Sequence, residues 1–491
     1  MAFRTVRPTR SGRVAPLESV GAASQVSTRE PRSTAAPAAG TCASTRGPSP
    51  WNRAWRPTSA STRSAARGGS RRRSGTVTVR EPRRALARAA ATLNGEPALA
   101  LVIAAVTGTN GKTTTTYLLE SIFEAAGWPA GLVGTTGARL RGEARPGALT
   151  TPESPELQAL LAEMRERGLE AVALEVSSHA LIQRRAWGLH SDVAIFTNLS
   201  HDHLDYHGTL EAYLDAKLML FDGRNGDHDR KPWTAVVNLD DPVAPQVLEA
   251  AARGGGTRRT FGAAQGADVR IESVEPGARG VVTTLRDSDS RVRIELPLLG
   301  RYNGWNAAGA YTAARVLGID SGVVVRGLAG SAGVPGRLER VDRGQPFQVV
   351  VDYAHTPDAL QKALAAAREH AAGRLLLVFG CGGDRDQAKR PAMGRAAADG
   401  ADQVWVTSDN PRGEDPAAIA RQIVSGMESK TGRVELDRRA AIAEALAAAR
   451  PGDLVLIAGK GHEVTQTIGD RVLPFDDREV AGELLEAGST R

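Results

Sequence analysis

The segment from Val106 to Thr115 reads Val-Thr-Gly-Thr-Asn-Gly-Lys-Thr-Thr-Thr, and it constrains the fold of this chain more than any other. The apolar run over residues 99–105 predicts a buried strand before it, and apolar residues at helical spacing follow it. A glycine-rich turn between a strand and a helix points backbone N–H groups and the positive end of the helix dipole at an anion. We therefore expect a phosphate-binding loop in which Lys112 contacts phosphate oxygens and Thr113 holds Mg²⁺.

A strict Walker A sequence has glycine where this chain has Val106, so the loop is a shortened variant. The competing interpretation is a glycine-rich turn that carries a surface lysine. The predicted strand before the turn and the threonines after Lys112 favour the phosphate-binding interpretation.

Length and composition indicate a globular protein with two to four domains, since the chain has 491 residues. No apolar run is long enough to cross a membrane, so we expect no membrane insertion. The two cysteines, Cys42 and Cys381, are far apart, which argues against a disulfide framework and suits a reducing, cytoplasmic compartment.

The net charge of +7 does not indicate a nucleic-acid partner, because the basic excess lies in residues 1–75. That segment has many arginines, no lysine and only two acids, Glu18 and Glu30, and no apolar periodicity. We expect it to be disordered. Three origins stay open for it, namely an organelle transit peptide, a basic nucleic-acid-binding tail, or an out-of-frame start; we favour the third.

The rest of the chain is typical of an α/β protein. A strand and a short helix are expected from about residue 76, and strands alternate with helices from residue 99 onward, which indicates largely parallel sheets. Residues 268–298 read as short alternating strands, an antiparallel addition, and a seam near Gly333–Gly336 divides two α/β blocks. The other predicted strands span 171–176, 192–197, 234–238, 348–353, 374–379, 403–407 and 453–458.

Polar residues follow several of these strands, where ligands of open α/β sheets collect. Glu175 closes a strand and is a reasonable Mg²⁺ ligand, although a capping role is as plausible. The stretch 198–208 holds three histidines and two aspartates, which suggests a metal or proton-transfer site; its spacing does not suit zinc. Lys217 follows on a predicted helix, and Asn303 and Asn306 open another, where they could pair with adenine or cap the helix.

In the second block, four polar loops follow four predicted strands and should share one face of one sheet. These loops are 352–357, 380–386, 408–413 and 459–463. Cys381, inside the second loop, has no partner base and is expected to be a small buried residue rather than a nucleophile.

The ordered set of these segments resembles the Mur ligases, the ATP-dependent amide-forming enzymes of peptidoglycan synthesis. The similarity runs from about Val77 to the C-terminus and is strongest to the branch that adds the third residue of the stem peptide. It rests on residues 107–114, 150–152, 175–179, 198–208, 303 with 306, 352–357, 380–385 and 459–463.

The resemblance implies three domains and a reaction. Residues 76–98 would be the remnant of an N-terminal uridine-nucleotide domain, 99–333 a central P-loop-type ATP-binding domain, and 334–491 a Rossmann-like C-terminal ligase domain. The family's N-terminal Asp-Ser-Arg signature does not occur in residues 1–75. The implied reaction adds meso-diaminopimelate to UDP-N-acetylmuramoyl-L-alanyl-D-glutamate through an acyl phosphate, with ATP and Mg²⁺, in a cytoplasmic monomer.

The resemblance also assigns roles to residues. The implied catalytic residues are Lys112, Glu175, His203 and Lys217, with Thr113, Glu175 and His203 as Mg²⁺ ligands and Lys217 modified to a carbamate (N6-carboxylysine). The implied ATP site is Gly108, Thr109, Asn110, Gly111, Lys112, Thr113, Thr114, Asn303, Asn306, Arg337 and Asp352. The implied muramoyl-dipeptide site is Thr150, Thr151, Ser177, Gln183 and Arg185, and the diaminopimelate site is Arg385, Asp409, Asn410, Pro411, Arg412, Gly459 and Glu463.

Arg412 is expected to decide the amino acid, because a guanidinium matches a distal carboxylate and repels the ammonium of lysine. A lysine-adding Mur ligase or a folylpolyglutamate synthase is the related alternative. A catalytically inactive, plastid-type relative whose basic leader takes it to a nucleic-acid complex is the alternative from another class, and the presence of Lys112, Glu175, His203 and Lys217 argues against it.

Overall fold

The structure is a computed structural model that describes residues 78–226, 230–277, 280–427 and 432–489. The expectations for residues 1–75 lie outside the described residues. The chain before Ala87 forms a unit of its own, of which 78–86 are described. The strand expected from about residue 76 falls partly outside the described residues, and residues 78–80 themselves form no strand. The helix expected after it is α1, Pro82–Leu93. Among the described residues, no helix has the length and apolar character that a membrane crossing needs.

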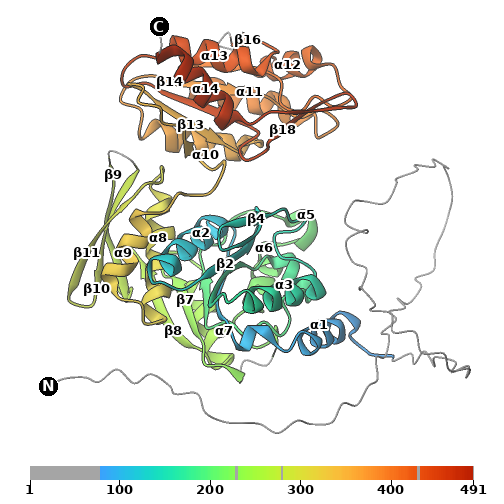
Figure 1. The fold of residues 1–491 in the computed structure, drawn as a ribbon, viewed down its shortest axis with the longest axis vertical. Coiled ribbons are helices and arrows are strands. Elements are labelled where there is room, and N and C mark those ends of the chain that lie inside the picture. The colour runs from blue at the N-terminus through green and yellow to red at the C-terminus, as the bar shows by residue number, and fades with distance from the viewer. Residues whose placement is uncertain (1–77, 227–229, 278–279, 428–431, 490–491) are drawn as a thin grey trace, which may run out of the picture. The chain divides into compact units, whose positions relative to one another are not determined.

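The second unit begins at Ala87. Its first part is built on an eleven-stranded sheet whose strands lie within residues 102–296 (Figure 1). Its order is β11-β10-β9-β8-β7-β6-β1-β5-β2-β3-β4, and the pairs from β9 through β2 are parallel. The strands are β1 Val102–Thr107, β2 Ala130–Gly134, β3 Gly137–Leu140, β4 Glu143–Arg145, β5 Ala171–Glu175, β6 Val193–Phe196, β7 Thr234–Asn238, β8 Thr257–Gly262, β9 Val269–Pro276, β10 Val281–Asp287 and β11 Ser290–Leu296.

Alternation along the strands sends side chains to two cores. In β1, Ala104 and Val106 pack with α2, α8 and α9, whereas Ile103 and Ala105 pack on the other face with α3 and α7. The helices of this part are α2 Lys112–Ala125, α3 Ser154–Glu166, α4 Ser178–Ile182, α5 Leu204–His207, α6 Leu210–Leu218, α7 Ala244–Arg253, α8 Tyr302–Val316 and α9 Ser321–Ala329, with the 3₁₀ turn η2 Pro97–Leu99.

The predicted antiparallel addition is confirmed as β9, β10 and β11, which pair antiparallel and continue the sheet beyond β8. The strands β2, β3, β4 and β8 were not predicted. β3 and β4 are short, and they hold arginine and glutamate among few apolar residues, so their sequence carries no strand pattern.

A six-stranded sheet, order β12-β13-β17-β14-β15-β16, organises residues 339–489. Its strands are β12 Glu339–Arg340, β13 Gln348–Asp352, β14 Leu375–Phe379, β15 Gln403–Val406, β16 Arg433–Val434 and β17 Leu454–Ala458, and β18 Thr465–Ile468 pairs with β19 Arg471–Pro474 as a hairpin. Helices α10 Pro357–Arg368, α11 Lys389–Gly400 and α12 Pro416–Val424 contribute to the core on one face of the sheet, and α13 Arg438–Ala448 and α14 Asp477–Ser489 to the core on the other.

The four predicted strands of this block are confirmed as β13, β14, β15 and β17. All four run parallel, so the four polar loops do follow the carboxyl ends of neighbouring strands. Cys381 is buried, as predicted, and burial raises the pKa of its thiol to about 12.

The position of α2, the helix after the phosphate loop, depends on a glycine in α9. A Cβ added to Gly327 would lie 2.6 Å from Ile122 Cα and 3.0 Å from the Ser121 carbonyl oxygen, both backbone atoms of α2. We expect Gly327→Ala to destabilise the fold by about 1–3 kcal/mol, because the helices must move apart. Urea unfolding followed by circular dichroism measures this.

Gly488→Ala is the matched control, since Gly488 also lies in a helix but its added Cβ would meet nothing within 4 Å. That change should be neutral or stabilise by up to about 1 kcal/mol. Equal effects of the two substitutions would contradict the close approach of α9 and α2.

Candidate active site

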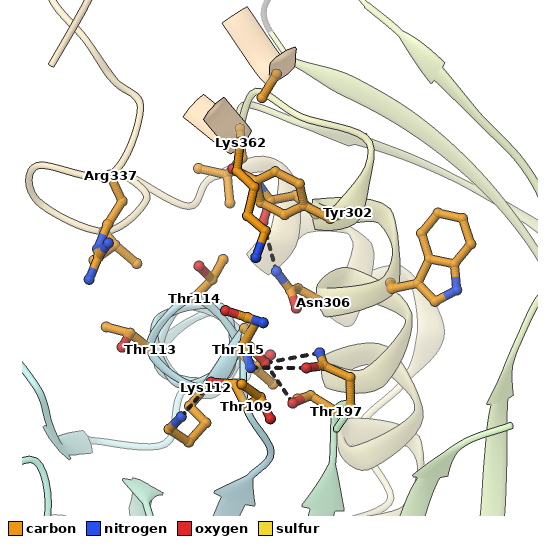
Figure 2. A pocket seen from close by; sticks show the side chains of 18 of the residues that line it. Thr109, Lys112, Thr113, Thr114, Thr115, Thr197, Tyr302, Asn306, Arg337 and Lys362 are labelled. Carbon is orange, nitrogen blue, oxygen red and sulfur yellow. Dashed lines mark hydrogen bonds between the residues drawn. The ribbon is translucent and has the colours of Figure 1, made fainter. Parts of the chain in front are cut away.

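A cavity of about 970 Å³ opens at the phosphate loop, and most residues predicted for the ATP site line it (Figure 2). Glu175, predicted as a metal ligand, also lines it. The predicted ATP-site residues in its wall are Thr109, Asn110, Gly111, Lys112, Thr113, Thr114, Asn303, Asn306, Arg337 and Asp352. Tyr302, Trp305 and Lys362 also line the cavity, and no role was predicted for them.

Backbone conformation shapes the loop between β1 and α2. Gly108 has φ +144° and Gly111 has φ +84°, a region that favours glycine. A side chain at Gly108 would overlap Thr197, and one at Gly111 would overlap the Asn306 amide. These two glycines therefore allow the loop to fold against its neighbours, and α2 begins directly after, at Lys112.

The segment that follows β6 holds the loop in place. The Thr197 hydroxyl donates to the Asn110 carbonyl oxygen at 2.6 Å, and the Asn198 side chain both accepts from Asn110 N (2.9 Å) and donates to its carbonyl oxygen (3.1 Å). Thr109 N donates to the Asn198 carbonyl oxygen at 2.8 Å. The loop is thus clamped by hydrogen bonds, which suits a rigid anion-binding cradle.

Two lysines meet at one atom of this loop. The Lys112 Nζ donates to the Gly108 carbonyl oxygen at 3.0 Å, and the Lys217 Nζ from helix α6 donates to the same oxygen at 2.7 Å. Burial lowers the pKa of Lys112, and burial, reinforced by the charge of Lys112, lowers the pKa of Lys217 well below its ordinary value. The two amines together give the loop an excess of positive charge that a bound anion would compensate.

Tyr213 packs under Lys217, whose Nζ lies 4.2 Å from the ring centroid. The tyrosine is buried, one helical turn from Lys217 on α6. A cation over an aromatic face is stabilised, so Tyr213 favours the charged amine that burial disfavours. No role was predicted for Tyr213, although its spacing of four residues from Lys217 places both on one helix face.

Glu175 lies fully buried at the end of β5. Its Oε1 accepts from Thr135 N at 2.9 Å and its Oε2 from the Thr135 hydroxyl at 3.1 Å, and Gly134 leaves room for the carboxylate because a Cβ there would overlap it. Glu175 therefore does not cap the turn that follows. A carboxylate fixed in the wall of the cavity that Thr113 also lines offers the hard oxygen donor that Mg²⁺ prefers, so these residues fit that ion.

His203 is not part of the described cavity wall, and neither is Lys217. The half-exposed His203 belongs to an aromatic cluster around His179, whose ring centroid lies 4.9 Å from that of His203 and 4.2 Å from that of Tyr206. His203 has φ +52° directly before α5. Among the described residues, no group of three or more His, Cys, Asp or Glu side chains is placed to hold a metal.

The five residues predicted for the muramoyl dipeptide are linked into one surface. The Thr151 hydroxyl donates to the Glu175 carbonyl oxygen (2.8 Å) and accepts from Ser177 N (3.1 Å). Arg185 donates to the Thr151 carbonyl oxygen (3.3 Å) and to the Gln183 side chain (2.5 Å). Thr150 joins through its hydroxyl contact with Thr135 at 3.1 Å, so this surface adjoins the Glu175 carboxylate.

In the C-terminal sheet, the loops after β15 and β17 are tied by a buried lysine. Lys460 Nζ lies 3.2 Å from Glu463 Oε2 and 3.5 Å from the Asn410 side-chain oxygen, and Asn410 donates to Glu463 at 2.8 Å. Asp409 is buried beside them, accepts from Asn410 at 3.0 Å, and has its pKa raised by that burial. The sequence placed Lys460 in a polar loop but gave it no role.

Arg412 is held with its backbone in the left-handed region, φ +51°. Arg412 N donates to the Thr467 carbonyl oxygen at 3.0 Å, and one guanidinium nitrogen donates to the Gly383 carbonyl oxygen at 2.7 Å. A Cβ on Gly382 would lie 2.9 Å from that guanidinium and 3.8 Å from Arg385 Cγ, so both arginines flank this glycine. Pro411 lies in the loop after β15, and Gly459 lies in the loop after β17. A Cβ added to Gly459 would lie 2.6 Å from a carboxylate oxygen of Asp409.

The lysine pair predicts a pH-dependent stability. Since folding lowers the pKa of Lys217, the unfolded chain binds more protons between that lowered value and about 10.5, so stability rises with pH in this window. Lys217→Met should raise the thermal midpoint at pH 7 by about 2 °C or more, and the difference should shrink towards pH 10. Calorimetry at several pH values measures it.

Lys362→Met is the control, because Lys362 is 59% exposed and should leave the midpoint nearly unchanged at every pH. A midpoint for Lys217→Met that lies below the wild-type value at pH 7 would contradict the argument that burial of this amine costs stability.

Comparisons with known proteins agree with this architecture. The sequence profile of the "Mur ligase middle domain" matches residues 106–314, and that of the "Mur ligase, glutamate ligase domain" matches residues 336–461. The UDP-N-acetylmuramoyl-L-alanyl-D-glutamate–2,6-diaminopimelate ligase of Solibacter usitatus is 45% identical over 84% of this chain and 82% of that protein. The protein of the same name from Geobacillus thermodenitrificans is 45% identical over 82% of this chain and 83% of its own length.

A solved structure with that same name is 36% identical and has a TM-score of 0.67, with 84% of both chains covered. The folylpolyglutamate synthase of Mycobacterium tuberculosis, solved with ADP and AMPPCP, is 19% identical with a TM-score of 0.59, covering 77% of this chain and 92% of that one; it shows a shared fold. The identity and coverage of the first three establish the family: this chain belongs to the Mur ligases.

Proposed function

We propose that this chain is an ATP-dependent amide ligase that joins meso-diaminopimelate to the D-glutamyl carboxylate of UDP-N-acetylmuramoyl-L-alanyl-D-glutamate, in peptidoglycan precursor synthesis. The observation that supports it most is the identity of 45% to relatives with this activity in their names, over more than four-fifths of both chains. We further propose that it acts as a cytoplasmic monomer without a nucleic-acid partner.

The chemistry begins with activation of a poor electrophile. A carboxylate oxygen of D-glutamate attacks the γ-phosphorus of ATP, and the bond between this phosphorus and the oxygen that bridges to the β-phosphate breaks. ADP is the leaving group, and the D-glutamyl carboxylate becomes an acyl phosphate. The backbone N–H groups of the clamped loop and the Lys112 amine would hold the phosphates in line for this attack. Mg²⁺ held by Thr113 and Glu175, with His203 as the family implies, would neutralise the phosphate charge.

The second step forms the amide. The amine of diaminopimelate attacks the acyl carbon, a tetrahedral oxyanion forms, the amine loses a proton, and the C–O bond to phosphate breaks. The dipeptide end of the nucleotide substrate would lie on the Thr150, Thr151, Ser177, Gln183 and Arg185 surface, which adjoins Glu175. Asn303 and Asn306 would lie near adenine in the same cavity, and Arg337 and Asp352 would reach the phosphate and the ribose of ATP.

Lys217 fits the proposed carbamate. Carbamate formation needs a neutral amine, and burial lowers the pKa of Lys217, which increases the neutral fraction. The product is an anion next to Lys112, a change from two like charges to an opposite pair at Gly108.

Selection of the amino acid is assigned to the loops after β14, β15 and β17. Arg412 and Arg385 flank Gly382 and would receive the distal carboxylate, and the Glu463 carboxylate, fixed by Asn410 and Lys460, would receive the distal ammonium. Lysine lacks the distal carboxylate, and its ammonium would face two guanidinium groups.

The assay is phosphate release by the full chain with ATP, Mg²⁺ and the UDP-muramoyl dipeptide, with diaminopimelate or lysine added in parallel. We expect release that depends on the dipeptide and on diaminopimelate. Arg412→Met should raise KM for diaminopimelate about 10- to 100-fold with a small effect on kcat, because a charged hydrogen bond worth about 1.5–3 kcal/mol is lost.

Arg421→Met is the control, since Arg421 is 72% exposed on α12 and should leave KM unchanged. Release with lysine in place of diaminopimelate, or an Arg412→Met variant with the KM of the wild type, would contradict the specificity assigned here.

A further inference from the structure

The antiparallel part of the large sheet, strands β9, β10 and β11 (Figure 1), carries three arginines at opposed positions. Arg286 on β10 is directly opposite Arg270 on β9 and directly opposite Arg291 on β11. Opposed residues of neighbouring strands share a face of the sheet, so the three guanidinium groups form one row. Like charges placed directly opposite each other are unfavourable, so the row needs a compensating anion.

One carboxylate serves all three arginines. Glu272 on β9 accepts from Arg286 Nε at 2.7 Å, lies 2.7 Å from Arg291 Nε, and lies 3.5 Å from Arg270 Nη2. A carboxylate has about four lone-pair sites and one charge, far fewer than three guanidinium groups require. Glu272 is only 14% exposed, so it lies beneath the arginines, which are 34%, 44% and 68% exposed for Arg270, Arg286 and Arg291.

An unused donor lies in the same group. Within the described residues, Arg270 Nε is buried and has no hydrogen-bond partner. A buried donor without a partner costs free energy. The row therefore lacks acceptors as well as negative charge.

A pocket of about 470 Å³ opens over this group, lined by Ala263, Gln265, Arg270, Ile271, Glu272, Arg286 and Arg291. Its rim shares a loop with the candidate active site. The Asp240 carboxylate accepts from Ala263 N (2.6 Å) and Ala264 N (2.8 Å) on the pocket side and from Trp305 Nε1 (2.6 Å), and Trp305 lines the nucleotide cavity.

We propose that the arginine row is a second anion site, distinct from the nucleotide cavity, that binds the phosphate group of a small ligand. Tetrahedral phosphate oxygens match the paired donors of guanidinium groups, and the site can receive free phosphate or a phosphate monoester. The competing explanation is that the arginines keep the edge strand β11 from pairing with another chain. That role needs charged residues on β11 alone, whereas this row crosses three strands.

The test is calorimetric titration of inorganic phosphate, and separately of glycerol phosphate, into the full chain saturated with AMPPCP and Mg²⁺. This triphosphate analogue also fills the γ-phosphate position of the nucleotide cavity, which ADP would leave open to the probe. We expect one salt-sensitive site per chain. Arg286→Gln with Arg291→Gln should weaken binding about tenfold or more. The control pair is Arg258→Gln on β8 with Arg293→Gln on β11, which removes the same charge at positions that do not line the pocket, and it should change affinity less than about twofold.

Glu272→Gln gives a change of opposite sign, because it removes the carboxylate that competes with the ligand; affinity should increase about threefold or more. Circular dichroism verifies that each variant is folded, and Arg291→Gln alone, the most exposed of the three, replaces the double variant if that one is unfolded. No binding by the AMPPCP-saturated wild type, equal losses in the two arginine pairs, or weaker binding by Glu272→Gln would each overturn the proposal. Binding of only one of the two probes identifies the source of the phosphate group.

Discussion

Two lysine side chains, Lys112 and Lys217, donate to one backbone oxygen, that of Gly108, and much of the candidate site depends on this contact. Two amines at one buried point cannot both stay charged at low cost without anions nearby. Burial lowers the pKa of Lys112, and the negative charges of Glu175 and Asp202 oppose that shift. The phosphates of a nucleotide would complete the compensation.

The clamp around the loop explains how the protein keeps this arrangement. Thr197 and Asn198 at the end of β6 fix Asn110, and α9 holds α2 through Gly327, where the helices approach closely. Rigid donors that are already in place do not have to reorganise during phosphoryl transfer, which is how electrostatic catalysis gains most. The same rigidity keeps the two lysines together in the absence of substrate.

Much of this could be predicted from sequence, and the reasons are local. The strand–turn–helix at residues 102–125, the strands beside it and the positions of the four polar loops of the second sheet have residue patterns that specify backbone geometry, and this geometry was confirmed. Phosphate binding by the loop stays a prediction. The structure also brings Thr151, Ser177 and Arg185 together, as the family resemblance implied. The strand expected from about residue 76 lies partly outside the described residues.

The rest depends on contacts between distant residues, which no local pattern contains. Lys460 looks like an ordinary loop lysine, yet it is fully buried and ties Asn410 to Glu463. Likewise, the arginines of β9, β10 and β11 read as solvated alternating positions until the strand register places them opposite one another. Strand register and burial, rather than composition, distinguish these residues from surface charge.

The central claim is that the substrate carboxylate is activated as an acyl phosphate. The most direct measurement uses UDP-muramoyl dipeptide with both oxygens of the D-glutamyl carboxylate labelled with ¹⁸O, and follows the released phosphate by mass spectrometry. If the carboxylate oxygen attacks ATP and then leaves with phosphorus, each phosphate should contain one ¹⁸O atom. Unlabelled phosphate released together with amide product would contradict this account.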